Sequence, residues 1–144
     1  MPLVGGGGAG NTAGSNPSSI GTSLNYIGNN CHAESGAFEA SQSEQTMFNF
    51  TTGSEHIVAT LTMTAPISFT VANIDEGVIR GYRLKFNSQI VGLYKADSQQ
   101  EDMPTMIEAQ ILIPPFTAVV LTCIDATADA EYLGTANITG RVYA

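Results

Sequence analysis

Apolar and polar residues alternate with a period of two through most of this chain, which is the spacing that turns successive side chains of a β-strand to opposite faces. Residues 57–64 give the longest example, with threonines on one face and four apolar residues on the other: Ile57, Ala59, Leu61 and Met63. In residues 82–86, two basic residues alternate with apolar ones. No segment has the helical period, so the pattern predicts an all-β chain.

Turn signals divide this pattern into about eight short strands. Nine segments are candidates for these strands: residues 23–27, 46–51, 57–64, 67–72, 82–86, 90–95, 106–113, 116–124 and 138–143. Several short strands with turns between them favour an antiparallel two-sheet β-sandwich of jelly-roll type.

Three local signals refine this expectation. Asn87-Ser88-Gln89 predicts a turn that joins the flanking strands into a hairpin, followed by an acidic connection at residues 96–103. Pro114-Pro115 ends a strand, because proline cannot donate to a ladder. Residues 116–124 are apolar on both faces, which indicates a central or covered strand.

The first nineteen residues differ from the rest, since glycine, serine and asparagine dominate and only Leu3 and Val4 can bury much apolar area. Ordering each such residue costs roughly 1–2 kcal/mol of backbone entropy. We therefore expect an extended arm at residues 1–19 and a sandwich domain at residues 20–144. The arm gains order against a partner surface; the alternative is a flexible linker.

Charged residues make up 12% of the chain, against roughly 25% in ordinary soluble domains. A surface of serine, threonine, asparagine and glutamine is easier to desolvate than an ionic one, which favours contact with neighbouring proteins. The alternative is an ordinary Ser/Thr-rich surface of a stable β domain. The net charge of −8 argues against nucleic acid as a partner.

Four of the five basic residues nevertheless cluster in one stretch: Arg80, Arg83, Lys85 and Lys95. They predict a local positive face that docks on an acidic partner, with a solvated strand face as the alternative.

The sequence offers little for catalysis or metal binding. Cys31 and Cys123 form no CxxC pair, cannot make a zinc site alone and are predicted to be free, packed thiols. The only histidines, His32 and His56, follow Cys31 and Glu55 directly, and adjacent residues of a strand point apart. Paired carboxylates such as Asp75-Glu76 and Glu101-Asp102 are interpreted as solvated turns.

Two further classes of site are also disfavoured. Gly5 to Thr12 has the glycine spacing of a phosphate-binding loop, but Asn11 replaces its lysine. The apolar runs are too short to cross a bilayer. We expect no cofactor, no metal, no membrane partner and no enzymatic activity.

Several segments resemble small virion structural proteins of tailed bacteriophages. They are Leu24-Asn25-Tyr26-Ile27-Gly28, His32-Ala33-Glu34-Ser35-Gly36, Phe50-Thr51-Thr52-Gly53 leading into Ile57-Val58, Ile113-Pro114-Pro115-Phe116-Thr117, and Thr139-Gly140-Arg141-Val142-Tyr143. The resemblance implies a β-sandwich attached to a capsid, often as a cement or decoration protein. It also implies trimers or binding where capsomers meet.

The resulting hypothesis is a capsid cement protein on the virion surface, assembled in the host cytoplasm, that bridges shell subunits through its arm. The partners implied are the major capsid protein or other virion subunits, and further copies of the chain, with a trimer favoured. The predicted partner-binding residues are Leu3, Val4, Arg80, Arg83, Lys85 and Lys95. Two alternatives remain open, namely a receptor- or glycan-binding head of a fibre or spike, and a small hydrolase.

Overall fold

A computed structural model of the chain describes residues 24–36, 38–39, 43–64, 67–68, 78–98, 106–125 and 132–143. These residues form strands and no helix. The strands are β1 (Asn25–Ile27), β2 (Asn30–Glu34), β3 (Phe38–Glu39), β4 (Gln45–Thr51), β5 (His56–Thr64), β6 (Ile67–Ser68), β7 (Val78–Phe86), β8 (Gln89–Ser98), β9 (Met106–Ile113), β10 (Ala118–Asp125), β11 (Tyr132–Gly134) and β12 (Ala136–Tyr143).

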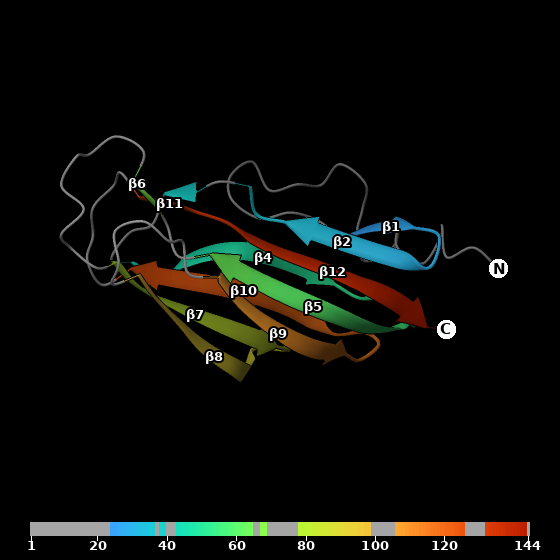
Figure 1. The fold of residues 1–144 in the computed structure, drawn as a ribbon. Helices are drawn as coiled ribbons and strands as arrows, with labels where there is room; N and C mark the ends of the chain where they lie inside the picture. Colours follow the sequence, from blue (N-terminus) through green and yellow to red (C-terminus); the bar gives the residue numbers. More distant parts are fainter. Residues whose placement is uncertain are drawn as a thin grey trace.

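Two antiparallel sheets stack face to face (Figure 1). The five-stranded sheet has the order β1-β2-β12-β5-β9, and the four-stranded sheet has the order β4-β10-β7-β8. A small third sheet has the order β3-β11-β6. The all-β prediction and the two-sheet sandwich are therefore confirmed.

The strand pairing is nested. β7 pairs with β8, β5 with β9, β4 with β10 and β2 with β12, all antiparallel. The first four of these strands along the chain are β2, β4, β5 and β7, and they pair in reverse order with the last four, β8, β9, β10 and β12. This arrangement is a jelly roll, to which β1 adds an edge strand.

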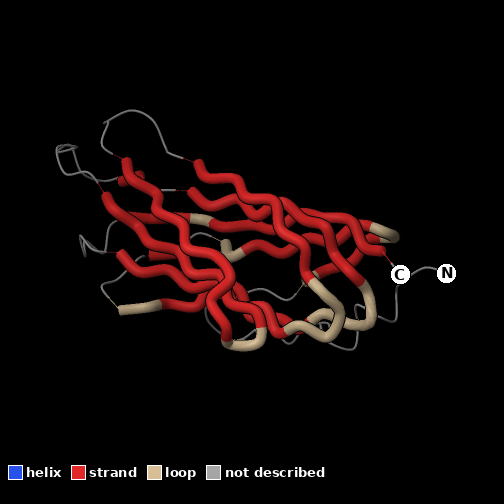
Figure 2. The backbone as a smooth tube through the Cα atoms, turned by 90° about the horizontal axis from the view of Figure 1, so that it is seen from below, coloured by secondary structure: helices blue, strands red, loops and turns tan. Residues whose placement is uncertain are grey.

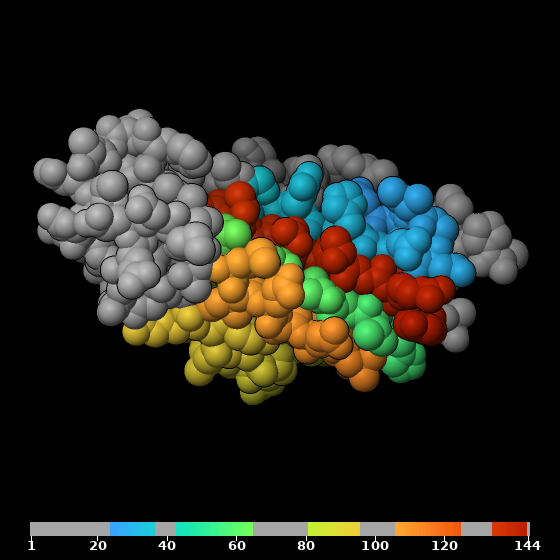
Figure 3. Space-filling model, in the orientation of Figure 1, coloured from blue at the N-terminus to red at the C-terminus, as the bar shows by residue number. Residues whose placement is uncertain are grey.

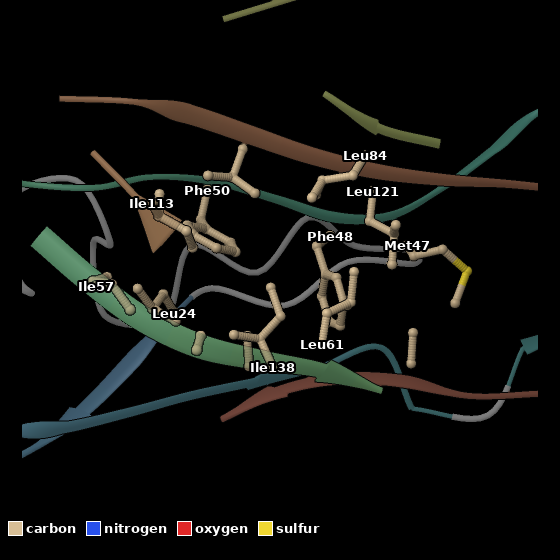
Figure 4. Close-up of a cluster of buried hydrophobic side chains, with 14 of the residues drawn as sticks. Leu24, Met47, Phe48, Phe50, Ile57, Leu61, Leu84, Ile113, Leu121 and Ile138 are labelled. Atoms are coloured by element: carbon tan, nitrogen blue, oxygen red, sulfur yellow. The ribbon is translucent and has the colours of Figure 1, made fainter. Parts of the chain in front are cut away.

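Alternating residues of both sheets fill the space between them (Figure 4). The largest fully buried side chains are Tyr82, Phe48, Leu24, Met47, Ile57, Leu61, Met63, Leu84, Ile113, Leu121 and Ile138. All four apolar residues predicted to share one face of residues 57–64 are buried. The Tyr82 hydroxyl donates to the carbonyl of Thr64 over 2.8 Å, so the buried phenol of one sheet bonds to a strand of the other.

The predicted hairpin and central strand are also present. β7 and β8 meet at Asn87-Ser88, where both residues have positive φ angles of 48° and 69°. β10, which covers most of residues 116–124, lies between β4 and β7. Cys31 and Cys123 are free and buried, as predicted.

Several strand predictions were wrong in detail. β2 was missed, because its inward residues, Cys31 and Ala33, are small and give a weak alternating signal. β8 extends to Ser98, so residues 96–98 belong to a strand and not to the expected connection. β10 begins at Ala118, two residues after the predicted start. Residues 69–72 of the expected strand at 67–72, and the boundary at residue 20, lie outside the described residues.

Candidate interaction surfaces

Three of the four clustered basic residues have described side chains, and these belong to neighbouring strands of the four-stranded sheet. Arg83 and Lys85 alternate along β7 with the buried Tyr82 and Leu84, so they lie on the outer face of that sheet. Lys95 is exposed on β8, and the backbone of Arg80 lies in β7.

Glu44, which the sequence did not single out, binds this basic pair. Its Oε1 lies 3.0 Å from Nζ of Lys85, and its Oε2 lies 3.3 Å from Nη1 of Arg83. The hydroxyl of Thr122 on β10 donates to Oε1 as well. The hydrogen bond from Thr122, followed by that from Lys85, lowers the pKa of Glu44 below its ordinary value of 4.5, and the two positive charges act in the same direction. One carboxylate therefore offsets part of the predicted positive face.

A second surface lies at the end of the sandwich where β12 finishes. Ile27, Phe116 and Tyr143 have exposed fractions of 74%, 73% and 49%, and together we call them the end surface. Hydrogen bonds and strand pairing join their segments. The N–H of Val142 donates to the carbonyl of Asn29, Tyr143 pairs with His56, and the N–H of Phe116 donates to the carbonyl of Gly53. The turns and loops of this end are visible in Figure 2, on the side of the C-terminus.

The backbone of Phe116 was assigned wrongly by the sequence pattern. Its φ angle is 51°, in the left-handed region that bulky residues rarely adopt, and it occupies a turn after Pro114-Pro115. Its apolar character extended the predicted strand to residue 116, whereas the ring projects into solvent.

The turn that carries Phe116 is fastened to the loop between β4 and β5. Thr52 and Thr117, both 2% exposed, exchange backbone and side-chain hydrogen bonds, and the Thr52 hydroxyl donates to the carbonyl of Pro114 over 2.9 Å. Satisfied polar groups at buried positions hold a loop in one conformation. The end surface is therefore built on a fixed support.

The adjacent pairs considered for catalysis point apart where they are described. Cys31 faces the core, whereas His32 lies on the outer face of β2. Glu55 is buried, and the neighbouring His56 is exposed at the start of β5. Within the described ranges, no three His, Cys, Asp or Glu side chains lie close enough to hold a metal ion.

Other predicted features fall outside the described residues. These are Leu3 and Val4 of the arm, the loop Gly5 to Thr12, and the acidic pairs Asp75-Glu76 and Glu101-Asp102. In the part of the chain that the structure describes, no helix of membrane-spanning length and apolarity is present.

A scan against models of protein families gave no match, and no curated protein matched the sequence. Among solved structures, the chain is similar to a chain of the T13 viral particle of IBDV, with 11% identity and a TM-score of 0.47 over 89% of this chain and 35% of that one. It is also similar to a chain of infectious bursal disease virus strain Gx, with 13% identity and a TM-score of 0.42 over 83% of this chain and 31% of that one.

A third similar structure is a family 35 carbohydrate-binding module from Clostridium thermocellum, with 11% identity and a TM-score of 0.33 over 86% of this chain and 83% of the module. The chain spans about a third of the length of the two viral chains, since the matches cover 35% and 31% of them. At such low identity and TM-score, these likenesses carry no information on function. The resemblance to tailed-phage virion proteins stays a prediction.

Proposed function

We propose that this chain is a structural virion protein that binds the outside of a phage capsid and bridges neighbouring shell subunits as a cement or decoration protein. The main observation in support is the end surface. A bulky aromatic ring stands 73% exposed on a left-handed backbone, on a turn whose buried threonines are fully engaged in hydrogen bonds. Strain of this kind, of order 1–3 kcal/mol, persists where the surrounding structure enforces it and often marks a binding contact.

In this proposal the end surface docks on the shell, and residues 1–19 act as the anchor on a neighbouring subunit. Fully extended, an arm of that length spans roughly 60–70 Å at ~3.3–3.6 Å per residue. The partners are the major capsid protein or other virion subunits. A bound cement stabilises the assembled shell by mass action, since it binds the assembled state and not the separated subunits.

The test is co-sedimentation of the purified full chain with phage shells stripped of it. We expect saturable binding, a loss of at least tenfold in affinity for Phe116→Ser, and a loss of similar size on deletion of residues 1–19. Glu34→Gln is the control, because Glu34 is exposed at the opposite end of β2 from the turn that bonds to Val142. Unchanged binding by both altered chains, with native circular dichroism spectra, would remove the basis of the proposal.

A second candidate function is a glycan-binding head of a fibre or spike, because Phe116 and Tyr143 place two exposed aromatic side chains at one end of the sandwich. Exposed aromatic rings are the usual stacking platforms for sugars. Binding to a glycan array that disappears in both Phe116→Ala and Tyr143→Ala, with no binding to shells, would favour this function over the cement role.

A further inference from the structure

The two sheets each end in an edge strand on the same side of the sandwich. β8 ends the four-stranded sheet and β9 ends the five-stranded sheet. Figure 3 shows the yellow atoms of β7 and β8 and the orange atoms of β9 beside each other, in agreement with the contacts between β8 and β9. Among the residues that the structure describes, each of these strands pairs with one neighbour, so its other edge has no backbone partner within those ranges.

Large apolar side chains are concentrated on these two strands. Five residues there are 52–70% exposed: Ile90, Val91 and Leu93 on β8, and Met106 and Leu112 on β9. Only four other exposed residues of this kind occur in the described ranges. The register of β9 with β5 is continuous over eight residues, without a bulge, and Glu108 is the one charged residue of this strand. A long, regular edge of this kind is a template for pairing with another chain.

We propose that two copies of this chain associate side by side, with β8 of one copy adding to β9 of the other. β8 begins after the turn at Asn87-Ser88, and β9 ends before Pro114. Both points lie at the end of the sandwich that carries the end surface, so the two strands run in opposite directions. A two-fold axis parallel to the strands then places β8 antiparallel to the second copy's β9. The same rotation places β9 against the second copy's β8.

A second copy is the occupant that satisfies both edges at once, because a two-fold interface is self-complementary. The four-stranded sheet of each copy would continue into the five-stranded sheet of the other. The described side chains with charge on the two strands are Lys95 and Glu108, of opposite sign. Cross-strand pairs of opposite charge favour one register.

The β-bulge at Val91 limits the regular part of β8 to residues 92–98. Placing Lys95 of one copy opposite Glu108 of the other puts Leu93 opposite Gln110. All four side chains alternate with inward residues and therefore share the outer face of the combined sheet. This pairing does not depend on the proposed function, since either a shell-binding protein or a glycan-binding head could form it.

The first experiment measures the mass of the full chain by sedimentation equilibrium across the micromolar range. We expect a dimer for the native chain and a dissociation constant raised at least tenfold in Lys95→Glu and in Glu108→Lys. The double variant Lys95→Glu/Glu108→Lys restores dimerisation, whereas the control Thr139→Glu, exposed on the central strand β12, leaves it unchanged. A monomer, a trimer, or no rescue by the double variant would overturn the proposal.

The second experiment distinguishes this pairing from one between two β8 strands. Leu93→Cys and Gln110→Cys chains are treated with a short thiol-reactive cross-linker, alone and mixed. The mixture gives linked dimers and each variant alone does not, while the buried Cys31 and Cys123 leave the native chain unlinked. Linkage of Leu93→Cys with itself would contradict the proposed arrangement, and shell binding by a monomer would leave the proposed function intact.

Discussion

Thr52 and Thr117 are joined by hydrogen bonds that involve both the main chain and a side chain. The N–H of Thr52 donates to the carbonyl of Thr117 over 3.0 Å, and the N–H of Thr117 donates to the Thr52 hydroxyl oxygen over 2.9 Å. Both residues are buried, so neither set of polar groups has water as a substitute. The loop between β4 and β5 and the turn that carries Phe116 therefore form one unit.

Thr52→Val keeps the side-chain shape and removes the three hydrogen bonds of the Thr52 hydroxyl, which leaves the N–H of Thr117 buried without that acceptor. We expect a loss of about 1–3 kcal/mol in the free energy of unfolding. Urea denaturation measures it. Thr51→Val, exposed one residue earlier, is the control and changes the value by less than about 0.5 kcal/mol. Equal effects of the two substitutions would argue against the coupling of the two loops.

β12 packs so closely against β5 at Gly140 that no side chain fits at this position. A Cβ at this position would lie 2.7 Å from both Cβ of Ala59 and the carbonyl oxygen of Val58. We expect Gly140→Ala to destabilise the fold by about 1–3 kcal/mol, because β12 has to shift. Gly81→Ala is the matched control, since its Cβ would meet only Cγ2 of Ile124 at 3.4 Å. Thermal unfolding of both variants checks this, and a tolerated Gly140→Ala would contradict the packing.

The cluster of Glu44, Arg83, Lys85 and Thr122 gives a defined pH dependence. The pKa of Glu44 is lower in the folded chain than its ordinary value of 4.5, so the unfolded chain takes up the proton first as the pH falls. The stabilisation is therefore complete above about pH 4.5 and is lost as the pH falls through the folded pKa.

We expect Glu44→Gln to be less stable than the native chain at pH 7 by less than about 1 kcal/mol, as is usual for exposed ion pairs. The difference closes below pH 4.5, as denaturant unfolding at a series of pH values would measure. Glu34→Gln, exposed on β2, serves as the control. A gap that stays constant down to low pH would show that the carboxylate charge does not stabilise the fold.

Tyr26 has a raised pKa, in contrast to Glu44, and therefore affects stability at alkaline pH. Burial of the phenol, followed by the charges of Glu55 and Cys31, raises its pKa from 10.0 to about 12. Because the folded chain holds this proton more tightly, its stability falls as the pH rises from 10 towards 12. We expect Tyr26→Phe to weaken that decline, and Tyr94→Phe to retain it. Absorbance titration of the phenolate provides the direct measurement.

Strong alternation was a reliable guide to this fold. Residues 57–64 and 106–113 became β5 and β9 nearly at their predicted limits, because apolar side chains occupy every inward position and three of the four in each strand are large. β2 gave no such signal, since its inward residues are small. The start of β10 was misjudged because Phe116 is apolar yet exposed, and one residue's hydrophobicity does not tell where its ring points.

The candidate surfaces were harder to predict from the sequence than the strands. The basic cluster was visible as a local run, but Glu44 lies 39 and 41 residues from its two cationic partners, and no local pattern connects them. The end surface likewise brings together the last residue of β1, the turn after β9 and the last residue of β12. Edge strands become identifiable only once the pairing order of both sheets is known.

The nested order of the strands also constrains when this chain can fold. Ser35 and Ala136 exchange two hydrogen bonds across 101 residues of sequence, at the start of the outermost strand pair. Until β12 has been synthesised and has left the ribosome, it cannot enter between β2 and β5. The larger sheet therefore closes late in synthesis, and contacts between such distant residues form slowly. During that interval the nascent chain depends on chaperones, or on low local concentration, to avoid aggregation.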